Sequence, residues 1–321
     1  MFIYPDIKTN QTLWLDTQDG HQIYVEESGN SNGYPVIYCH GGPGGGSSSQ
    51  FRRLFDPSFY RIIIFDQRGC GQSKPFLSLE NNTTQNLVED IELIRKHFEL
   101  DQVLLAGGSW GTTLALLYAQ KYPDNVSAML LRGIFLGREQ DLEWLYEKEG
   151  AARLFPDYYA EFKAYLSDSA TSHQQIIDEY LAHLTNGNEI EQLAAAKVWC
   201  SWESKIAKLH YSHEEQEHAT EAHNALAMAL LECHYFKNKC FIEENQIIKN
   251  IDKIAHIPAT IIHGRYDAVC DLSQAWQLRQ VWQNSELLIV PEAGHSLAEI
   301  AIAKACCQAS QDFMTYFKEQ E

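Results

Sequence analysis

Apolar and polar positions alternate in two segments near the start of the chain. Gln11–Asp16 and His21–Glu27 both show a period of two, and Asp19-Gly20 lies between them. This pattern is typical of an antiparallel hairpin with a glycine in its turn. Shorter, continuously apolar runs follow at Pro35–Cys39 and Tyr60–Phe65, and they predict strands that are buried on both faces.

Helical periodicity separates the later apolar runs from one another. Thr84–Phe98 places apolar residues three and four positions apart, so we predict an amphipathic helix there. A further strand and helix are expected from Val103 onward, and Ser127–Arg132 is the next strand-like run. Strands that alternate with helices at this spacing indicate an α/β fold, with a mostly parallel central sheet and helices on both faces.

This alternation stops after the last of these strands. Residues 135–245 show helical spacing and many aromatic residues, with almost no strand-like run. Strand patterns resume at Ala259–Gly264 and Glu286–Val290, and a final amphipathic helix is predicted over Ala298–Phe317. The predicted domains are a core formed by residues 1–134 and 246–321 and an inserted all-helical cap formed by residues 135–245.

The composition narrows the class of protein. The chain has 321 residues, of which 45% are hydrophobic and 21% charged, as in globular proteins with a sizeable core. Its formal net charge of -18 argues against nucleic acid or an anionic membrane as a partner, because both require a basic face. No apolar run is long enough for a transmembrane helix.

Cysteines and histidines suggest neither disulfides nor a metal. The eight cysteines form no C-x-x-C pair, and Met1–Asp6 lacks the basic and apolar regions of a signal peptide. Free thiols in a reducing cytoplasm are therefore expected. The thirteen histidines show no H-E-x-x-H or comparable ligand spacing, so no metal site is predicted. No oligomeric state is predicted.

The first candidate for chemistry lies in the stretch Val103–Leu117. Its turn reads Gly107-x-Ser109-x-Gly111 between a predicted strand and helix, which is the pattern of a nucleophile elbow. Glycines beside the serine avoid clashes that a Cβ atom would make with the neighbouring elements. The Ser109 hydroxyl would then be exposed at the carboxyl edge of the sheet. A glycine-rich turn that holds a serine by chance is the alternative, and the strand and helix context argues against it.

Two later residues could complete a catalytic triad. A serine nucleophile needs a base and an orienting acid, and in elbow architectures the chain order is Ser, Asp or Glu, then His. Asp267 follows the strand Ala259–Gly264, and His295 follows the strand Glu286–Val290. Parallel strands end at one edge of a sheet, so both side chains are expected beside Ser109. A turn aspartate and a loop histidine are the alternatives, and both would have to occur by chance in the right order.

An oxyanion hole needs backbone N–H groups aimed at the developing alkoxide. We expect one from Trp110, directly after the serine, and one from Gly42 in the loop His40–Gly46, because glycine lets the backbone approach a substrate closely. The alternative is that this loop binds a phosphate group. The loop lacks the P-loop lysine, however, and no obvious helix and ribose-binding acid follow it, which argues against a nucleotide site.

Six motifs together resemble the prolyl iminopeptidases, which are α/β-hydrolase serine peptidases with a helical cap. They are His40-Gly41-Gly42-Pro43-Gly44-Gly45-Gly46, Asp66-Gln67-Arg68-Gly69-Cys70-Gly71-Gln72-Ser73, Gly107-Gly108-Ser109-Trp110-Gly111, Leu131-Arg132-Gly133-Ile134-Phe135-Leu136, Gly264-Arg265-Tyr266-Asp267 and Gly294-His295-Ser296. The resemblance covers nearly the whole chain. It implies the α/β-hydrolase fold and a serine exopeptidase that releases an N-terminal proline from small peptides through a prolyl-enzyme. Such a reaction needs no metal or organic cofactor.

The same resemblance assigns substrate specificity to the cap. Glu203 and Glu232 lie in segments similar to the family's two glutamate-bearing segments, which implies that they hold the free amino end of the substrate. Two carboxylates in a partly dry pocket pair with a prolyl ammonium far better than water-exposed ones. Aromatic walls would hold the pyrrolidine ring, and Phe135 and Tyr146 are the candidates. Exposed helix charges are the alternative for both glutamates.

Two other functions stay open at this point. A carboxylesterase or lactone hydrolase would use the same fold and triad, because the substrate depends on the cap. A non-catalytic binding protein with a hydrolase fold is the second, although an intact Ser109, Asp267 and His295 argue against it. Hydrolysis of a prolyl anilide compared with p-nitrophenyl acetate separates the peptidase from the esterase.

Overall fold

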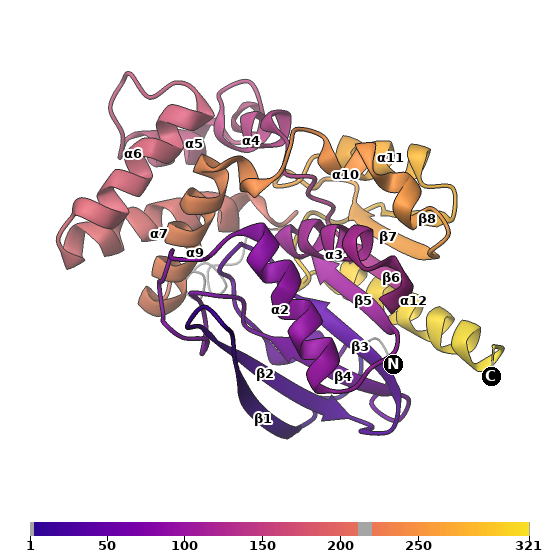
Figure 1. Ribbon diagram of the computed structural model, residues 1–321. Coiled ribbons are helices and arrows are strands. Elements are labelled where there is room, and N and C mark those ends of the chain that lie inside the picture. The colour runs from indigo at the N-terminus through magenta and orange to yellow at the C-terminus, as the bar shows by residue number, and fades with distance from the viewer. Residues whose placement is uncertain (1–2, 211–219, 321) are drawn as a thin grey trace.

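The computed structural model of the protein describes residues 3–210 and 220–320, and a single twisted sheet runs through it (Figure 1). The strands are β1 (Thr9–Asp16), β2 (Gln22–Gly29), β3 (Tyr34–Cys39), β4 (Tyr60–Phe65), β5 (Val103–Gly108), β6 (Val126–Arg132), β7 (Ala259–Gly264) and β8 (Ser285–Val290). Their order across the sheet is β1-β2-β4-β3-β5-β6-β7-β8. Pairing is antiparallel from β1 to β4 and parallel from β4 to β8, which confirms the predicted mostly parallel sheet.

The strand patterns in the sequence follow from burial. β4 has the predicted bounds, Tyr60–Phe65, because its apolar run is covered on both faces of the sheet. Along β3 and β4 the side chains alternate between two cores. Ile37 and Ile63 belong to the core beneath the first face, and Val36 and Ile62 belong to the core beneath the second. The β1–β2 hairpin forms as expected, with one strand exposed at the edge of the sheet.

Helices cover both faces of the sheet, and one hydrophobic core lies between the sheet and the helices on each face (Figure 1). The helices packed around it are α1 (Ser49–Arg52), α2 (Thr84–His97), α3 (Trp110–Lys121), α11 (Leu272–Val281) and α12 (Ile300–Lys318). α2, α3 and α11 contribute to the first core, whereas the apolar side of α12 closes the second. In residues 3–210 and 220–320, every helix is too short or too polar to cross a membrane.

Between β6 and β7, all the longer elements in the described residues are helices, and most of them gather at one end of the sheet (Figure 1). They are α4 (Glu139–Tyr146), α5 (Pro156–Lys163), α6 (His173–Asn186), α7 (Glu189–Ile206), α9 (Ala222–Lys237) and α10 (Gln246–Lys249). Short 3₁₀ turns occur in this segment at Ala151–Arg153, Lys239–Phe241 and Ile251–Ile254, and another, Pro123–Asn125, precedes β6. Residues 211–219 of the predicted cap lie outside the described residues, and the division into core and cap domains stays a prediction.

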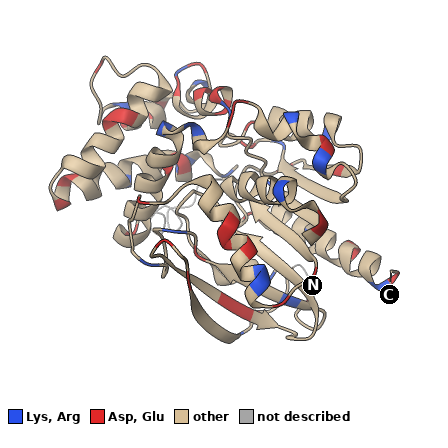
Figure 2. Ribbon diagram, in the orientation of Figure 1, with Lys and Arg blue, Asp and Glu red and all other residues tan. Residues whose placement is uncertain are grey.

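Acidic positions are spread over the helices and the sheet rather than gathered on one element (Figure 2). The functionally relevant consequence of the fold is the common edge of the parallel strands. Ser109 follows β5, Gly133 follows β6, and Asp267 and His295 lie in the loops after β7 and β8. Four segments far apart in the sequence therefore meet at the carboxyl ends of adjacent strands.

Candidate active site

Ser109 occupies the tight turn between β5 and α3. Its backbone has φ 57° and ψ −128°, a strained conformation for a residue with a side chain. The Ser109 N–H donates a hydrogen bond to the Arg132 carbonyl oxygen at 2.9 Å, which ties the turn to the end of β6. A Cβ atom on Gly111 would lie 2.1 Å from the Cys39 carbonyl oxygen, so the close passage of α3 over β3 requires glycine.

The two predicted partners of the serine are hydrogen-bonded to each other. His295 Nδ1 lies 2.7 Å from Asp267 Oδ2, and both residues are buried. Gly133 packs against this pair with φ 61°, and a Cβ atom there would lie 2.9 Å from His295 Cε1. Glycine at this position therefore leaves room for the imidazole between the ends of β6 and β8.

Asp267 is surrounded by donors. Its Oδ1 atom accepts hydrogen bonds from the backbone N–H groups of Val269 at 3.0 Å and Cys270 at 2.8 Å. Burial by itself would raise the pKa of this carboxyl, but the neighbouring His295 and the backbone donors favour its charged form. The pKa of Asp267 consequently lies below its ordinary value, and the carboxylate can hold His295 in one tautomer and stabilise its cation.

A second histidine, which no sequence motif marked as a site residue, lies behind this carboxylate. His263 is fully buried at the end of β7, and its Nε2 atom is 3.3 Å from Asp267 Oδ2. Its Nδ1 atom accepts from the Ile134 N–H at 3.1 Å, so Nε2 carries the proton and donates to the Cys270 carbonyl oxygen at 2.9 Å. Burial lowers the pKa of His263, which keeps the ring neutral.

The glycine loop after β3 lies against the serine. A Cβ atom on Gly41 would be 3.2 Å from Ser109 Cβ. The Gly41 carbonyl accepts from His40 Nδ1 at 2.8 Å and from the Gly45 N–H at 3.2 Å, and this orients the peptide unit that carries the Gly42 N–H. Within the part of the chain that the structure describes, neither this N–H nor that of Trp110 donates to a protein acceptor. Both predicted oxyanion donors are therefore available.

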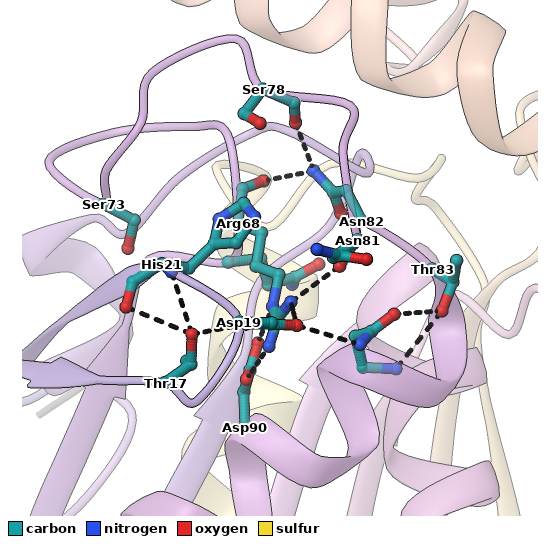
Figure 3. Close-up of polar contacts among 12 residues, drawn as sticks. Thr17, Asp19, His21, Arg68, Ser73, Ser78, Asn81, Asn82, Thr83 and Asp90 are labelled. Atoms are coloured by element: carbon teal, nitrogen blue, oxygen red, sulfur yellow. Dashed lines mark hydrogen bonds and ion pairs between the residues drawn. The ribbon is translucent and has the colours of Figure 1, made fainter.

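Gln67 joins the two halves of this candidate oxyanion hole. Its side chain donates to the His40 carbonyl oxygen at 2.8 Å and accepts from Trp110 Nε1 at 2.9 Å. The next residue, Arg68, anchors the Gln67 loop beneath the surface (Figure 3). It donates to both carboxylate oxygens of Asp90 at 2.7 Å and to Asp19 at 2.6 Å. The motif around Gln67 and Arg68 thus has a local structural role, which is to hold the glycine loop after β3 against the start of α3.

The two predicted glutamates lie next to each other. Glu232 on α9 is 1% exposed and accepts a hydrogen bond from Trp199 Nε1 at 2.5 Å. Burial and the adjacent Glu203 carboxylate raise the pKa of Glu232 well above its ordinary value. Burial also raises the pKa of Glu203, and the proximity of His295 opposes part of that shift. Glu203 is consequently close enough to His295 for the two side chains to interact electrostatically.

Aromatic rings connect these glutamates to the other two predicted pocket residues. Tyr146 lies 4.7 Å from Trp199 and 5.9 Å from Phe236 between ring centroids, and Phe236 is 5.9 Å from Phe135. Among the residues that the structure describes, no group forms a hydrogen bond with the buried Tyr146 hydroxyl. Phe135 and Tyr146 are thus brought to one apolar wall beside the glutamate pair.

Comparisons with known proteins identify the family to which this chain belongs. A family model described as alpha/beta hydrolase fold matches residues 34–300. The chain is 43% identical over 311 residues to the proline iminopeptidase of Arabidopsis thaliana, covering 96% of this chain and 81% of that protein. It is also 43% identical over 312 residues to the proline iminopeptidase of Xanthomonas citri, covering 97% and 99% of the two chains. The chain belongs to the proline iminopeptidase family.

Solved structures show the wider fold to which this family belongs. An esterase from Exiguobacterium antarcticum matches with a TM-score of 0.65 and 19% sequence identity, over 96% of this chain and 100% of the other. A bromoperoxidase from Bacillus anthracis matches with a TM-score of 0.65 and 21% identity over the same shares. These likenesses confirm the α/β-hydrolase fold, and at such low identity they carry no information about the substrate.

One group of side chains in the described residues has the spacing of metal ligands, away from the family's motifs. Ligand atoms of Glu143, Glu147 and His173 lie within 4.8 Å of one another, where α4 meets α6. Glu147 already accepts from His173 Nδ1 at 2.8 Å, and Glu143 is exposed. A hydrogen bond between two helices accounts for this cluster.

Proposed function

We propose that this protein is a serine exopeptidase that releases an N-terminal proline from peptides through a prolyl-enzyme intermediate. The observation that carries the proposal is the pair of adjacent carboxylates Glu203 and Glu232, of which Glu232 is buried and Glu203 lies within electrostatic reach of His295. A cationic group is the ligand that such a pair favours. Relatives named proline iminopeptidase, at 41–43% identity over nearly the full length, support a prolyl aminopeptidase function.

The reaction would proceed by acyl transfer to Ser109. The hydroxyl oxygen attacks the scissile carbonyl carbon while His295 Nε2 takes its proton, and Asp267 stabilises the resulting imidazolium. The N–H groups of Trp110 and Gly42 bind the oxyanion. His295 then gives the proton to the leaving amine as the C–N bond breaks. Water, deprotonated by the same imidazole, hydrolyses the prolyl ester and regenerates the serine.

The glutamate pair would make the enzyme an exopeptidase. A prolyl nitrogen at a free terminus is a secondary ammonium with two N–H donors, and it can form one charge-assisted hydrogen bond to each carboxylate. A proline within a chain has neither the charge nor the donors. The aromatic wall of Phe135, Tyr146 and Trp199 would hold the pyrrolidine ring.

The proposal extends to domain organisation and compartment. We infer that residues 135–245 act as a cap domain that supplies specificity, while residues 1–134 and 246–321 supply the triad. Eight free cysteines, all buried, suit a reducing compartment, and on that ground we propose a cytoplasmic enzyme.

A panel of p-nitroanilides tests the function. We expect proline p-nitroanilide to be cleaved faster than the alanine and leucine anilides, and N-acetylproline p-nitroanilide, which lacks the ammonium, to be cleaved at least about 100-fold more slowly. A fluorophosphonate should label the wild-type protein and not Ser109→Ala. Preferential hydrolysis of p-nitrophenyl acetate, with no preference for proline, would favour an esterase. Failure of labelling would favour a non-catalytic binding protein.

A further inference from the structure

The end of α7 is bonded directly to the loop that carries the catalytic histidine. The carbonyl oxygen of Ala207, which caps α7, accepts hydrogen bonds from the His295 N–H at 2.8 Å and from the Ser296 N–H at 2.9 Å. On its other side, His295 is held by Asp267 at Nδ1 and by Arg132, which donates to its carbonyl oxygen at 2.7 Å. The catalytic loop is therefore positioned by α7 as well as by the sheet.

One carboxylate holds the same two segments together at a second point. Glu299 accepts from the Leu209 N–H at 3.1 Å through Oε1 and from the Gly294 N–H at 2.7 Å through Oε2. Gly294 lies so close that a Cβ atom there would be 3.0 Å from the Ala207 carbonyl oxygen and 3.3 Å from the Leu209 nitrogen. Glu299 thus links the chain leaving α7 to the residue preceding His295.

The link between α7 and the His295 loop matters for the substrate because Glu203 lies near the same end of α7. Glu203 precedes Ala207 by four residues, about one helical turn, so a displacement of the end of α7 moves both. In an N-terminal proline, the nitrogen and the scissile carbonyl carbon are separated by two bonds, about 2.5 Å. If Glu203 holds the substrate ammonium, it therefore also sets the position of the carbonyl carbon. This carbon is correctly placed for Ser109 only if the distance between Glu203 and the triad is fixed.

We propose that Glu299 is a positioning residue that couples recognition of the substrate ammonium by Glu203 to proton transfer by His295. It acts by fixing the end of α7 against the loop Gly294–Ser296. This inference rests on the proposed function, because it concerns a substrate that the enzyme recognises through its ammonium group. Substrates without an ammonium group do not depend on the spacing, since His295 keeps its bonds to Asp267 and Arg132.

The test compares Glu299→Ala with Glu292→Ala, which removes an exposed glutamate from the same loop. Rates are expressed per active site, counted by fluorophosphonate titration, so that unfolded protein does not contribute. We expect Glu299→Ala to lower kcat/KM for proline p-nitroanilide about 30-fold and that for p-nitrophenyl acetate less than about threefold, as for a lost charge-assisted hydrogen bond. Glu292→Ala should change neither. Equal losses on both substrates, or no loss, would overturn the proposal.

Glu299→Gln keeps one acceptor oxygen and serves if the alanine variant does not fold. It should show a smaller loss that is again selective for the anilide, and an unselective loss would count against coupling.

A double-mutant cycle with Glu203→Gln adds a second criterion. Once the ammonium-binding carboxylate is gone, Glu299→Ala should have little further effect on the anilide, whereas additive losses would contradict the coupling. If the wild-type enzyme shows no preference for proline anilides, the proposed function is wrong. If it prefers proline but Glu299→Ala lowers kcat/KM equally for both substrates, only the proposed coupling through Glu299 is wrong.

Discussion

Two buried carboxylates in this protein have opposite protonation behaviour. Asp267 is 6% exposed and its pKa lies below the ordinary value, whereas Glu232 is 1% exposed and its pKa is raised well above it. Burial disfavours the charge on both. The difference comes from their neighbours, because Asp267 faces His295 and two backbone N–H groups, while Glu232 faces one indole N–H and a second glutamate.

The contrast in pKa distinguishes Asp267, whose charge the protein stabilises, from Glu232, whose charge needs a bound cation for stabilisation. The partners that stabilise the Asp267 charge are all supplied by the protein, so in the proposed mechanism the carboxylate would be ready to stabilise the His295 imidazolium in every turnover. The charge of Glu232 lacks such compensation in the free enzyme. In the proposed function, the ammonium of the substrate supplies it, and binding therefore discriminates in favour of a free amino terminus.

The largest expected effect comes from neutralising the permanent anion. Asp267→Asn should lower kcat about 10⁴-fold for proline p-nitroanilide, and strongly for p-nitrophenyl acetate, because both reactions need the His295 tautomer that the carboxylate selects. Steady-state kinetics on the two substrates measures this. A variant that folds and retains more than a tenth of the wild-type kcat would contradict the role of Asp267.

Neutralising the second carboxylate should act on binding. Glu232→Gln keeps an acceptor for Trp199 Nε1 but removes the charge, so we expect KM for proline p-nitroanilide to rise about 100-fold while kcat changes much less. p-Nitrophenyl acetate should be hardly affected, and the exposed Glu292→Gln provides the matched control. Equal losses on the two substrates would place Glu232 with Asp267 in the catalytic machinery and remove the distinction between them.

The pH dependence should differ between the two substrates. Because the pKa of Glu232 is raised in the free enzyme, a proton competes with the ammonium, and KM for the anilide should fall by up to about tenfold per pH unit as pH rises toward that pKa. Titration of the triad affects both substrates and cancels in the ratio of their kcat/KM values, which leaves the glutamate pair and the amine of the anilide itself. This ratio should become flatter with pH in Glu232→Gln. An unchanged slope would assign the proton to another group.

Local sequence patterns located the residues of the proposed triad more fully than the rest of the candidate site. Ser109, Asp267 and His295 each follow an apolar strand, and the parallel order of those strands brings their ends together. β4 was predicted with its observed bounds for the same reason, since strands buried on both faces are continuously apolar. α11 was not predicted because exposed Trp276 and buried Gln274 obscure its helical period.

The remaining site residues depend on contacts that no local pattern encodes. Glu203 and Glu232 lie on separate helices, and only resemblance to a family connected them. His263 and Glu299 act on backbone N–H groups of remote segments, at Ile134 and Leu209, and such groups are present at almost every residue of a chain. A histidine four residues before Asp267 was visible in the sequence, but its partner became evident only with the fold.

The smallest expected effect is on stability, where the two carboxylates should have opposite signs. The lowered pKa of Asp267 means that its charge stabilises the folded state above the unfolded pKa, and that this contribution is lost as pH falls through the folded pKa. The raised pKa of Glu232 means the reverse, since its contribution is present at low pH and is lost as pH rises through the folded value. Asp267→Asn should therefore lower the unfolding temperature at pH 7.

Glu232→Gln should instead raise the unfolding temperature, and by more at pH 8 than at pH 5. A change of about 1 kcal/mol in unfolding free energy corresponds to roughly 2 °C for a chain of this size. Thermal unfolding without substrate, followed by circular dichroism, measures both variants. Destabilisation by Glu232→Gln at pH 8 would mean that the protein itself compensates the Glu232 charge, and the substrate ammonium would no longer be needed to explain why this carboxyl is buried.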